Sequence, residues 1–179
     1  DITSYGRLVN EGKFKEALEV ILDKNPLPFM TGNICTHTCQ SACTRNHYET
    51  DVQIRSNKLI AARGGYDTVL PELKQEGAVQ KKVGVIGAGP AGISAAFFLA
   101  RAGVEVHVYD KDAVAGGVVA NVIPGFRIPA EEIQKDVNLA KQYGAQFHLG
   151  QEVNDIDAFR KENNFDAVIV AIGAHKEAP

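Results

Sequence analysis

The stretch KVGVIGAGPAGISAAFFLARAGVEVHVYD, residues 82–110, decides the fold of this chain. Its pattern predicts an apolar strand over residues 82–86, a glycine-rich turn, a helix over 90–102 and a second strand over 105–109. A strand, a helix and a strand in this order make two parallel strands joined by a crossover helix. The sequence therefore predicts an α/β fold with a parallel sheet in this part of the chain.

The turn after the first strand reads Gly87-Ala88-Gly89-Pro90-Ala91-Gly92, a G-x-G-x-x-G pattern. In this pattern Gly87 permits the tight turn, Gly89 lets a pyrophosphate approach the backbone, and Gly92 lets the helix pack close to the strand. Pro90 and Ala91 open the helix, whose N-terminus offers N–H groups and a partial positive charge to phosphates. We therefore expect this turn to bind a dinucleotide, either FAD or NAD(P), since both use such a loop.

Asp110 ends the second strand, 18 residues after Gly92. In dinucleotide-binding folds an acidic residue at about this distance holds the ribose hydroxyls. The alternative is an ordinary glycine-rich turn followed by a surface aspartate. The strand, helix, second strand and acid stand in the expected register, and this favours the dinucleotide site.

Three further elements follow. A helix is expected over residues 129–143, with a proline at its start, acidic residues in its first turn and Gly144 after its end. Two more strands are expected over 146–149 and 167–171. Four parallel strands in the order 3-2-1-4 would form the first half of a Rossmann-type domain, which we assign to residues 79–179.

The residues before this domain have a different pattern. Apolar residues at helical spacing predict two short helices within 4–24, and a third helix over 56–63 that Gly64 and Gly65 would end. Residues 66–81 are polar enough to be a linker. We assign residues 1–78 to a helical domain that bears all three cysteines.

Composition excludes some classes of partner. The 179 residues contain 19 Lys and Arg against 22 Asp and Glu, so nothing indicates nucleic-acid binding. The longest apolar stretch, 167–172, is too short to cross a bilayer, so no membrane insertion is expected. The chain begins at Asp1 rather than at methionine, and we interpret it as a fragment of a longer cytoplasmic protein.

Cys35, Cys39 and Cys43 are spaced C-x-x-x-C-x-x-x-C. Thiolates at this spacing can converge on an iron–sulfur cluster, which normally takes four cysteines. A zinc site completed by His37 or His47 and a set of ordinary reduced thiols remain as alternatives. No histidine has a carboxylate or hydroxyl partner at a telling spacing, so we name no catalytic residue.

With these motifs in place, the chain resembles the iron–sulfur flavoprotein family of the glutamate synthase small subunit and the N-terminal part of dihydropyrimidine dehydrogenase. Within that family it looks most like the selenate reductase-type subunit. The resemblance runs nearly end to end. The motifs that carry it are Glu11 to Phe14, Asn25 to Pro28, Thr31 to Cys35, Cys43 to Arg45, Gly87 to Gly92, Gly116 to Val119 and Ile123 to Pro129.

The resemblance implies a helical domain holding [4Fe-4S] clusters, followed by an FAD domain into which an NADPH domain is inserted. It also implies that Gly116, Gly117 and Gly173 approach the flavin nucleotide, which favours FAD over NAD(P) in the glycine loop. Gly173 could instead be a simple turn at the end of a strand. Electrons would pass from NAD(P)H to FAD, to the clusters and on to an electron-accepting partner domain or subunit.

Two departures limit this reading. Thr31 stands where the resemblance leads us to expect a cysteine, and the gap from Cys35 to Cys39 is shorter than the resemblance implies. The resemblance also implies cysteine ligands upstream of residue 1, which are not in the chain. Cys35, Cys39 and Cys43 are therefore an incomplete ligand set. We expect the isolated chain to be inactive and to bind FAD weakly or not at all.

The sequence thus indicates a fragment of an NAD(P)H-linked iron–sulfur flavoprotein oxidoreductase. Two rivals remain open. One is an NAD(P)-binding dehydrogenase domain, and the other is an interaction module of a larger complex that has lost its cofactors.

Overall fold

The computed structural model describes residues 1–174, and their packing divides the chain into two compact units. Unit 1 is Asp1–Glu72 and unit 2 is Leu73–Pro179. The sequence places the boundary six residues later, at 78/79. Residues 75–81 pack on unit 2.

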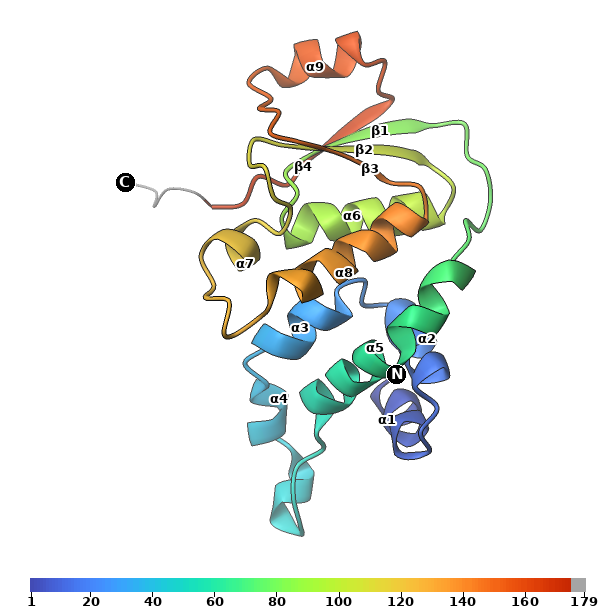
Figure 1. Ribbon diagram of the computed structural model, residues 1–179, viewed down its shortest axis with the longest axis vertical. Coiled ribbons are helices and arrows are strands. Elements are labelled where there is room, and N and C mark those ends of the chain that lie inside the picture. The colour runs from blue at the N-terminus through green and yellow to red at the C-terminus, as the bar shows by residue number, and fades with distance from the viewer. Residues whose placement is uncertain (175–179) are drawn as a thin grey trace. The chain divides into compact units, whose positions relative to one another are not determined.

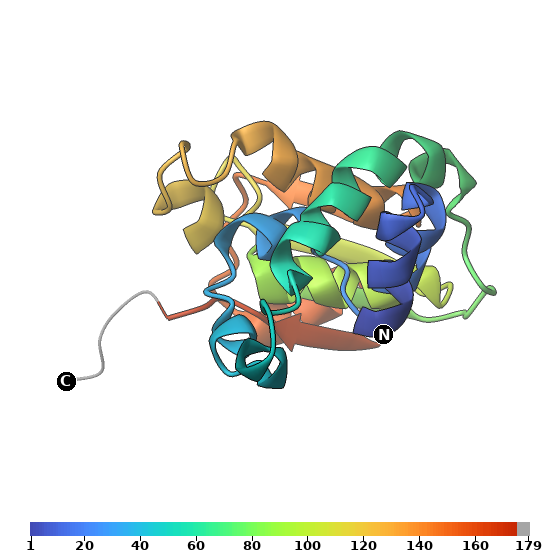
Figure 2. The same cartoon turned by 90° about the horizontal axis from the view of Figure 1, so that it is seen from below.

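Unit 1 is helical. Helices α1 (Ile2–Asn10) and α2 (Phe14–Leu22) pack side by side against α5 (Ile54–Val69), as the blue and teal helices of Figures 1 and 2 show. Their apolar faces enclose a small core of Tyr5, Ala17, Ile21 and Ala61. The shorter elements of the unit are α3 (Pro28–Ile34), α4 (Thr38–Ser41), and the 3-10 helices η1 (Thr44–His47) and η2 (Leu70–Glu72).

The expectation that Gly64 and Gly65 end a helix is wrong. Helix α5 continues through both glycines to Val69. A Cβ on Gly64 would lie 2.7 Å from the Phe14 ring, and one on Gly65 would lie 2.5 Å from the Phe14 carbonyl oxygen. These glycines therefore serve the close approach of α2 to α5 rather than a C-cap, and the expected linker begins only after the helix.

Unit 2 is the predicted α/β fold. Its four parallel strands stand in the order β3-β2-β1-β4, as expected. Helices α6 and α8 cover one face, while α9 lies on the opposite side of the sheet (Figure 1). The elements are β1 (Lys82–Ile86), α6 (Pro90–Arg101), β2 (Glu105–Asp110), α7 (Val118–Asn121), α8 (Ala130–Gln142), β3 (Gln146–Leu149), α9 (Ile156–Glu162) and β4 (Ala167–Val170).

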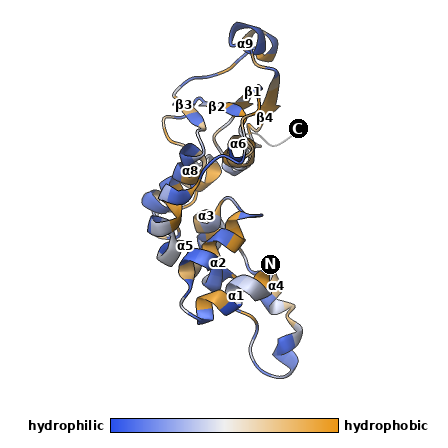
Figure 3. Cartoon of the chain, turned by 90° about the vertical axis from the view of Figure 1, so that its right-hand side faces the viewer, coloured by the Kyte–Doolittle hydropathy of each residue, from blue (hydrophilic) through white to orange (hydrophobic). Residues whose placement is uncertain are grey.

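The core of unit 2 lies between the sheet and α6. Val85, Val106 and Val108 of the two central strands are fully buried, as are Ile93 and Phe97 of α6. The strands carry hydrophobic residues and α9 is mostly hydrophilic (Figure 3). Helix α9 was not expected from the sequence, because seven residues are too few to show a helical period.

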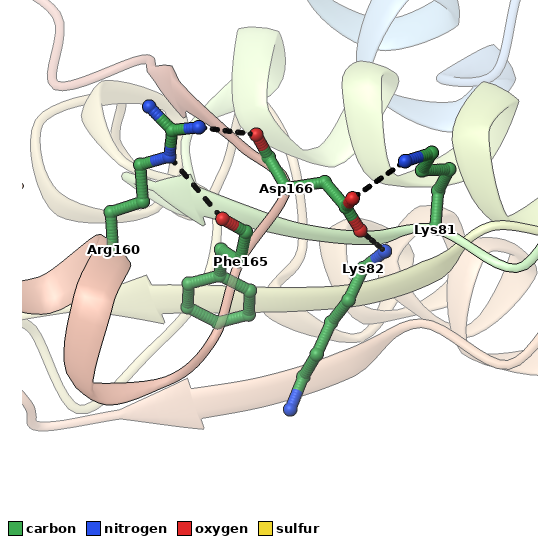
Figure 4. Close-up of polar contacts among 5 residues, drawn as sticks. All are labelled: Lys81, Lys82, Arg160, Phe165 and Asp166. Atoms are coloured by element: carbon green, nitrogen blue, oxygen red, sulfur yellow. Dashed lines mark hydrogen bonds and ion pairs between the residues drawn. The ribbon is translucent and has the colours of Figure 1, made fainter.

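Asp166 fixes the start of β4 beside β1, as Figure 4 shows. Its carboxylate accepts from the Lys82 backbone N–H at 2.8 Å and pairs with the Lys81 ammonium at 2.7 Å. Its own N–H donates to the Lys82 carbonyl, and Arg160 of α9 donates to the carbonyls of Phe165 and Asp166. These bonds set the register of the two strands.

Residues 75–81 form a strap on unit 2 instead of a free linker. The N–H of Glu76 donates to the Arg101 carbonyl, and the N–H of Val79 donates to the Gly103 carbonyl. The Gln75 amide donates to the Tyr143 carbonyl at the C-terminus of α8, at 2.9 Å. Satisfied backbone groups hold this segment to the unit it precedes.

Among residues 1–174, no helix is both long and apolar enough to cross a membrane.

Candidate dinucleotide-binding site

The three glycines of the loop have different physical roles. Gly87 has φ of +107°, and a Cβ there would lie 2.3 Å from the Ala171 carbonyl oxygen. A Cβ on Gly92 would lie 1.8 Å from the Gly87 carbonyl oxygen and 3.3 Å from Val85. The fold itself therefore requires glycine at Gly87, for the turn, and at Gly92, for the close packing of α6 on β1.

Gly89 is different. Its φ of −78° suits any residue, and an added Cβ would meet nothing closer than the Gly117 Cα at 3.9 Å. The protein itself therefore leaves room for a side chain at this position. Gly89 is the N-cap of α6, so the space beside it faces the free N–H groups of the first turn.

The segment at Gly116 and Gly117 lies against the glycine loop. The Gly116 N–H donates to the Ala88 carbonyl at 2.8 Å, and both glycines have positive φ, +128° and +54°. A Cβ on Gly117 would lie 2.9 Å from the Gly89 Cα. The tertiary structure thus brings together two glycine motifs that lie far apart in the sequence.

Asp110 contacts the glycine loop directly. One carboxylate oxygen accepts from the Ala88 N–H at 2.5 Å, and the other accepts from the Asp112 N–H at 2.8 Å. The carboxylate therefore fixes the loop beside the end of β2. Each oxygen has further lone pairs, so these bonds leave room for a ligand hydroxyl.

A cavity of about 470 Å³ lies at the carboxyl ends of β1, β2 and β4, the place where parallel α/β sheets bind ligands. Of the predicted residues, Gly87, Gly89, Pro90, Ala91, Asp110, Gly117 and Gly173 line it. Gly92 and Gly116 are outside the lining and support the loop from behind. Gly173 has φ of +70°, and within the described residues 1–174 no atom lies within 4 Å of a Cβ added there.

Sequence reasoning missed one wall of the cavity. Gln151, Glu152 and Val153, which follow β3, line it together with Tyr109 of β2. Gly150 turns the chain with φ of +72°, and the Gln151 N–H donates to the Asp110 carbonyl at 2.8 Å. A glycine directly after the third strand was the available signal, but only the strand order shows that this turn meets the end of β2.

Burial raises the pKa of the Tyr109 phenol, which lines the cavity. In unit 1, burial and the nearby Cys39 raise the pKa of Tyr5 to about 12.

The three cysteines lie in the segment between α3 and α5. Cys35 is the C-cap of α3, Cys39 is exposed in α4, and Cys43 is the N-cap of η1. Over the described range 1–174, no three Cys, His, Asp or Glu side chains are grouped to hold a metal ion. Within this range the cysteines are thus not arranged as a complete ligand set, and neither His37 nor His47 joins them in such a group.

The Thr31 hydroxyl is already engaged within its own helix. It donates to the Leu27 carbonyl at 2.7 Å and accepts from the Asn25 amide at 2.9 Å. In this arrangement Thr31 stabilises the start of α3.

Comparison with known families separates the same two units. The model of the pyridine nucleotide-disulphide oxidoreductase family matches residues 81–179, more than half of the chain. The model of dihydropyrimidine dehydrogenase domain II, 4Fe-4S cluster, matches residues 1–63. The first family implies FAD and NAD(P)H binding, and the second implies a 4Fe-4S cluster.

Several curated proteins are similar over nearly all of the chain. YgfK of Escherichia coli (strain K12), named as an oxidoreductase, is 42% identical over 99% of the chain and 17% of its own length. The NADPH-Fe(3+) oxidoreductase subunit beta of Geobacter sulfurreducens is 32% identical over 100% of the chain and 27% of its own length. The glutamate synthase [NADPH] small chain of Bacillus subtilis is 32% identical over 98% of the chain and 36% of its own length.

The chain thus spans between 17% and 36% of the length of these three relatives.

Proposed function

Since this chain belongs to the pyridine nucleotide-disulphide oxidoreductase family, we propose that unit 2 binds FAD in the cavity at the carboxyl ends of β1, β2 and β4. The pyrophosphate would lie over Gly87 and Gly89, against the N–H groups at the start of α6. Asp110 would hold the ribose, while Gly117 and Gly173 would border the nucleotide.

The observation that carries this proposal is the empty space at Gly89. The fold requires glycine where a Cβ would collide with neighbouring atoms. Among residues 1–174, the nearest atom to a Cβ added at Gly89 is the Gly117 Cα at 3.9 Å, so packing does not explain glycine here. A ligand that lies against this backbone does explain it. The space is bordered by Gly117, and both residues line the cavity.

We extend the proposal to the whole protein of which the chain is a part. It would be an NAD(P)H-linked iron–sulfur flavoprotein of the cytoplasm that passes electrons to a partner domain or subunit. Bound FAD would supply the exchange between hydride and single electrons, which no side chain provides. The names of the relatives from Geobacter and Bacillus, which include NADPH, support this reading.

In unit 1, Cys35, Cys39 and Cys43 would be part of a [4Fe-4S] ligand set completed by thiolates outside these residues. The match to a 4Fe-4S domain at residues 1–63 supports this assignment. Because the present residues do not form a complete set, no electron-transfer step is assigned to them.

The test is a pair of glycine variants. In the longer protein of which this chain is a part, Gly89→Val should abolish FAD binding, measured by quenching of flavin fluorescence, without lowering the melting temperature. Gly125→Val is the matched control, since a Cβ there also meets nothing within 4 Å but Gly125 does not line the cavity. Full FAD binding by Gly89→Val would contradict the assignment of this cavity to FAD.

The same titration with NADPH tests the rival dehydrogenase reading. In the same longer protein, tighter binding of NADPH than of FAD, lost in Gly89→Val, would reassign the cavity to the nicotinamide nucleotide.

A further inference from the structure

Two histidines from neighbouring strands are hydrogen-bonded on the α9 side of the sheet. His107 Nδ1 of β2 lies 3.0 Å from His148 Nε2 of β3. On its other side, His107 Nε2 lies 2.8 Å from a carboxylate oxygen of Glu105. A continuous polar chain therefore runs from an exposed carboxylate to His148.

Aromatic contacts continue this chain to the cavity. The His148 ring stacks on Tyr109, with centroids 4.4 Å apart and planes at 21°. Tyr109 lines the cavity and meets Phe159 of α9 edge-on at 4.8 Å. Val153, which also lines the cavity, packs on the same cluster as Phe159.

The hydrogen bond between the two histidines limits the number of protons that the pair can hold. The Glu105 carboxylate keeps a hydrogen on His107 Nε2. A neutral His107 then accepts at Nδ1 from His148, while a charged His107 donates from Nδ1 to His148. Both states need one hydrogen between the facing nitrogens. When both rings are charged, two N–H groups point at each other and the bond is lost.

The surroundings of His148 disfavour the proton that would make both rings charged. Burial lowers the pKa of His148 below its ordinary value of 6.5, and the charges of His107 and Lys82 lower it further. Tyr109 and Glu105 are the other titratable groups on β2 at this face. From α9 the neighbouring ring is Phe159, and Arg160 is bonded to the Phe165 and Asp166 carbonyls.

Strand β3 is at the edge of the sheet, so β2 alone holds it by strand pairing. Directly after β3 the chain supplies the wall residues Gln151, Glu152 and Val153. Repulsion between His107 and His148 would act across the β2–β3 pair, at the end where this wall begins. Loss of the bond would therefore loosen the wall before it loosened the central strands.

We propose that His107 and His148 form a proton-controlled latch on the dinucleotide cavity, closed while the pair shares one hydrogen and loosened by a second proton. The latch rests on the proposed function, because it regulates the same cavity. The direction of the pH dependence follows from the lowered pKa of His148, because the folded state binds a proton at His148 less well than the unfolded state does. Latch stability is complete above about pH 6.5 and falls as the pH drops through that value.

The test measures FAD affinity at about pH 7.5 and about pH 5.5 in the longer protein of which this chain is a part. The wild-type dissociation constant should rise at least about fivefold at the lower pH, and the rise should be absent in His148→Gln, whose amide does not titrate. Gln134→Ala, at an exposed site on α8, should keep the wild-type ratio. Equal ratios in wild type and His148→Gln would overturn the latch. If His148→Gln does not fold, His107→Gln takes its place.

A second measurement separates the latch from the proposed function. Amide protection factors of Gly150 and Gln151, whose N–H groups bond to Asp112 and Asp110, should fall at the lower pH in the ligand-free wild type but not in His148→Gln. This result with no FAD binding at either pH would support the latch and reject the FAD proposal. Unchanged protection in the wild type would reject the latch, whatever binds.

Discussion

At the scale of single residues, the three glycines of the loop at residues 87–92 have different roles. Gly87 and Gly92 are required by the backbone, since an added Cβ would lie 2.3 Å and 1.8 Å from carbonyl oxygens. Gly89 meets no such contact. Substitutions within this one motif should therefore have different effects. A side chain at Gly87 or Gly92 should lower the stability of the fold, whereas one at Gly89 should weaken ligand binding.

Gly92→Ala should destabilise the chain by about 2–4 kcal/mol, because the new Cβ forces α6 away from β1. Thermal or urea unfolding measures the change. Gly125→Ala, which meets nothing within 4 Å, should change stability by less than about 0.5 kcal/mol. Comparable losses in the two variants would show that the tight packing at Gly92 is not needed.

Asp110→Ala should weaken FAD binding and also destabilise unit 2. The sequence suggested a role in ligand binding alone, but both carboxylate oxygens accept backbone N–H groups. Leaving these donors without a partner costs about 1–3 kcal/mol, measured by denaturant unfolding without ligand. Asp110→Asn keeps one acceptor and should lose less. An unchanged apo stability in Asp110→Ala would restore the purely ligand-binding role.

At the scale of elements, packing overrides local preference. A pair of glycines after a helical pattern normally marks a helix end, yet α5 continues to Val69 because Gly64 and Gly65 face Phe14 of α2. In the same way, polar residues 75–81 suggest a linker but lie along unit 2. In both cases the partner is distant in sequence, so no local pattern shows it.

Two helix glycines should respond to alanine in opposite directions. Gly65→Ala should destabilise unit 1 by about 2 kcal/mol, because the Cβ would lie 2.5 Å from the Phe14 carbonyl oxygen. Gly6→Ala in α1 should stabilise it by about 0.5–1 kcal/mol, since the nearest atom is a side-chain nitrogen at 3.8 Å and alanine favours helix. Helicity and urea midpoints measure both. Stabilisation by Gly65→Ala would contradict the packing of α2 on α5.

At the scale of the whole molecule, the two units differ in how complete their cofactor sites are. Unit 2 has its cavity, its glycine loop and its acidic residue in one place. Unit 1 has three cysteines that no described side chain completes into a metal site.

Anaerobically purified chain should contain far less than one [4Fe-4S] cluster per molecule. Three thiolates do not fill the four positions that such a cluster normally takes. Iron and acid-labile sulfide analysis measures this, with Cys39→Ser as the control for adventitious iron. One cluster per chain, lost in Cys39→Ser, would show that the ligand set is complete within these residues.

The local pattern alone was sufficient for much of unit 2. The types of the strands and helices and the loop at residues 87–92 follow from hydrophobic period and glycine spacing. The order 3-2-1-4 follows from the fold class that this pattern indicates. Strands β1 and β3 have the predicted bounds. The type of a strand, helix or turn depends mainly on residues that are neighbours in sequence. A local pattern is therefore enough to predict it.

Tertiary structure alone decided the rest. The cavity wall after β3, the contact of Gly116 with Ala88, the bond from Asp110 to the loop and the pair of His107 with His148 all join residues from different elements. Each depends on which strand ends lie side by side and at what register. A hydrogen bond needs its two heavy atoms within about 3 Å, whatever their separation along the chain. Only the packing of the core brings residues from different elements this close, so no local sequence pattern shows these contacts.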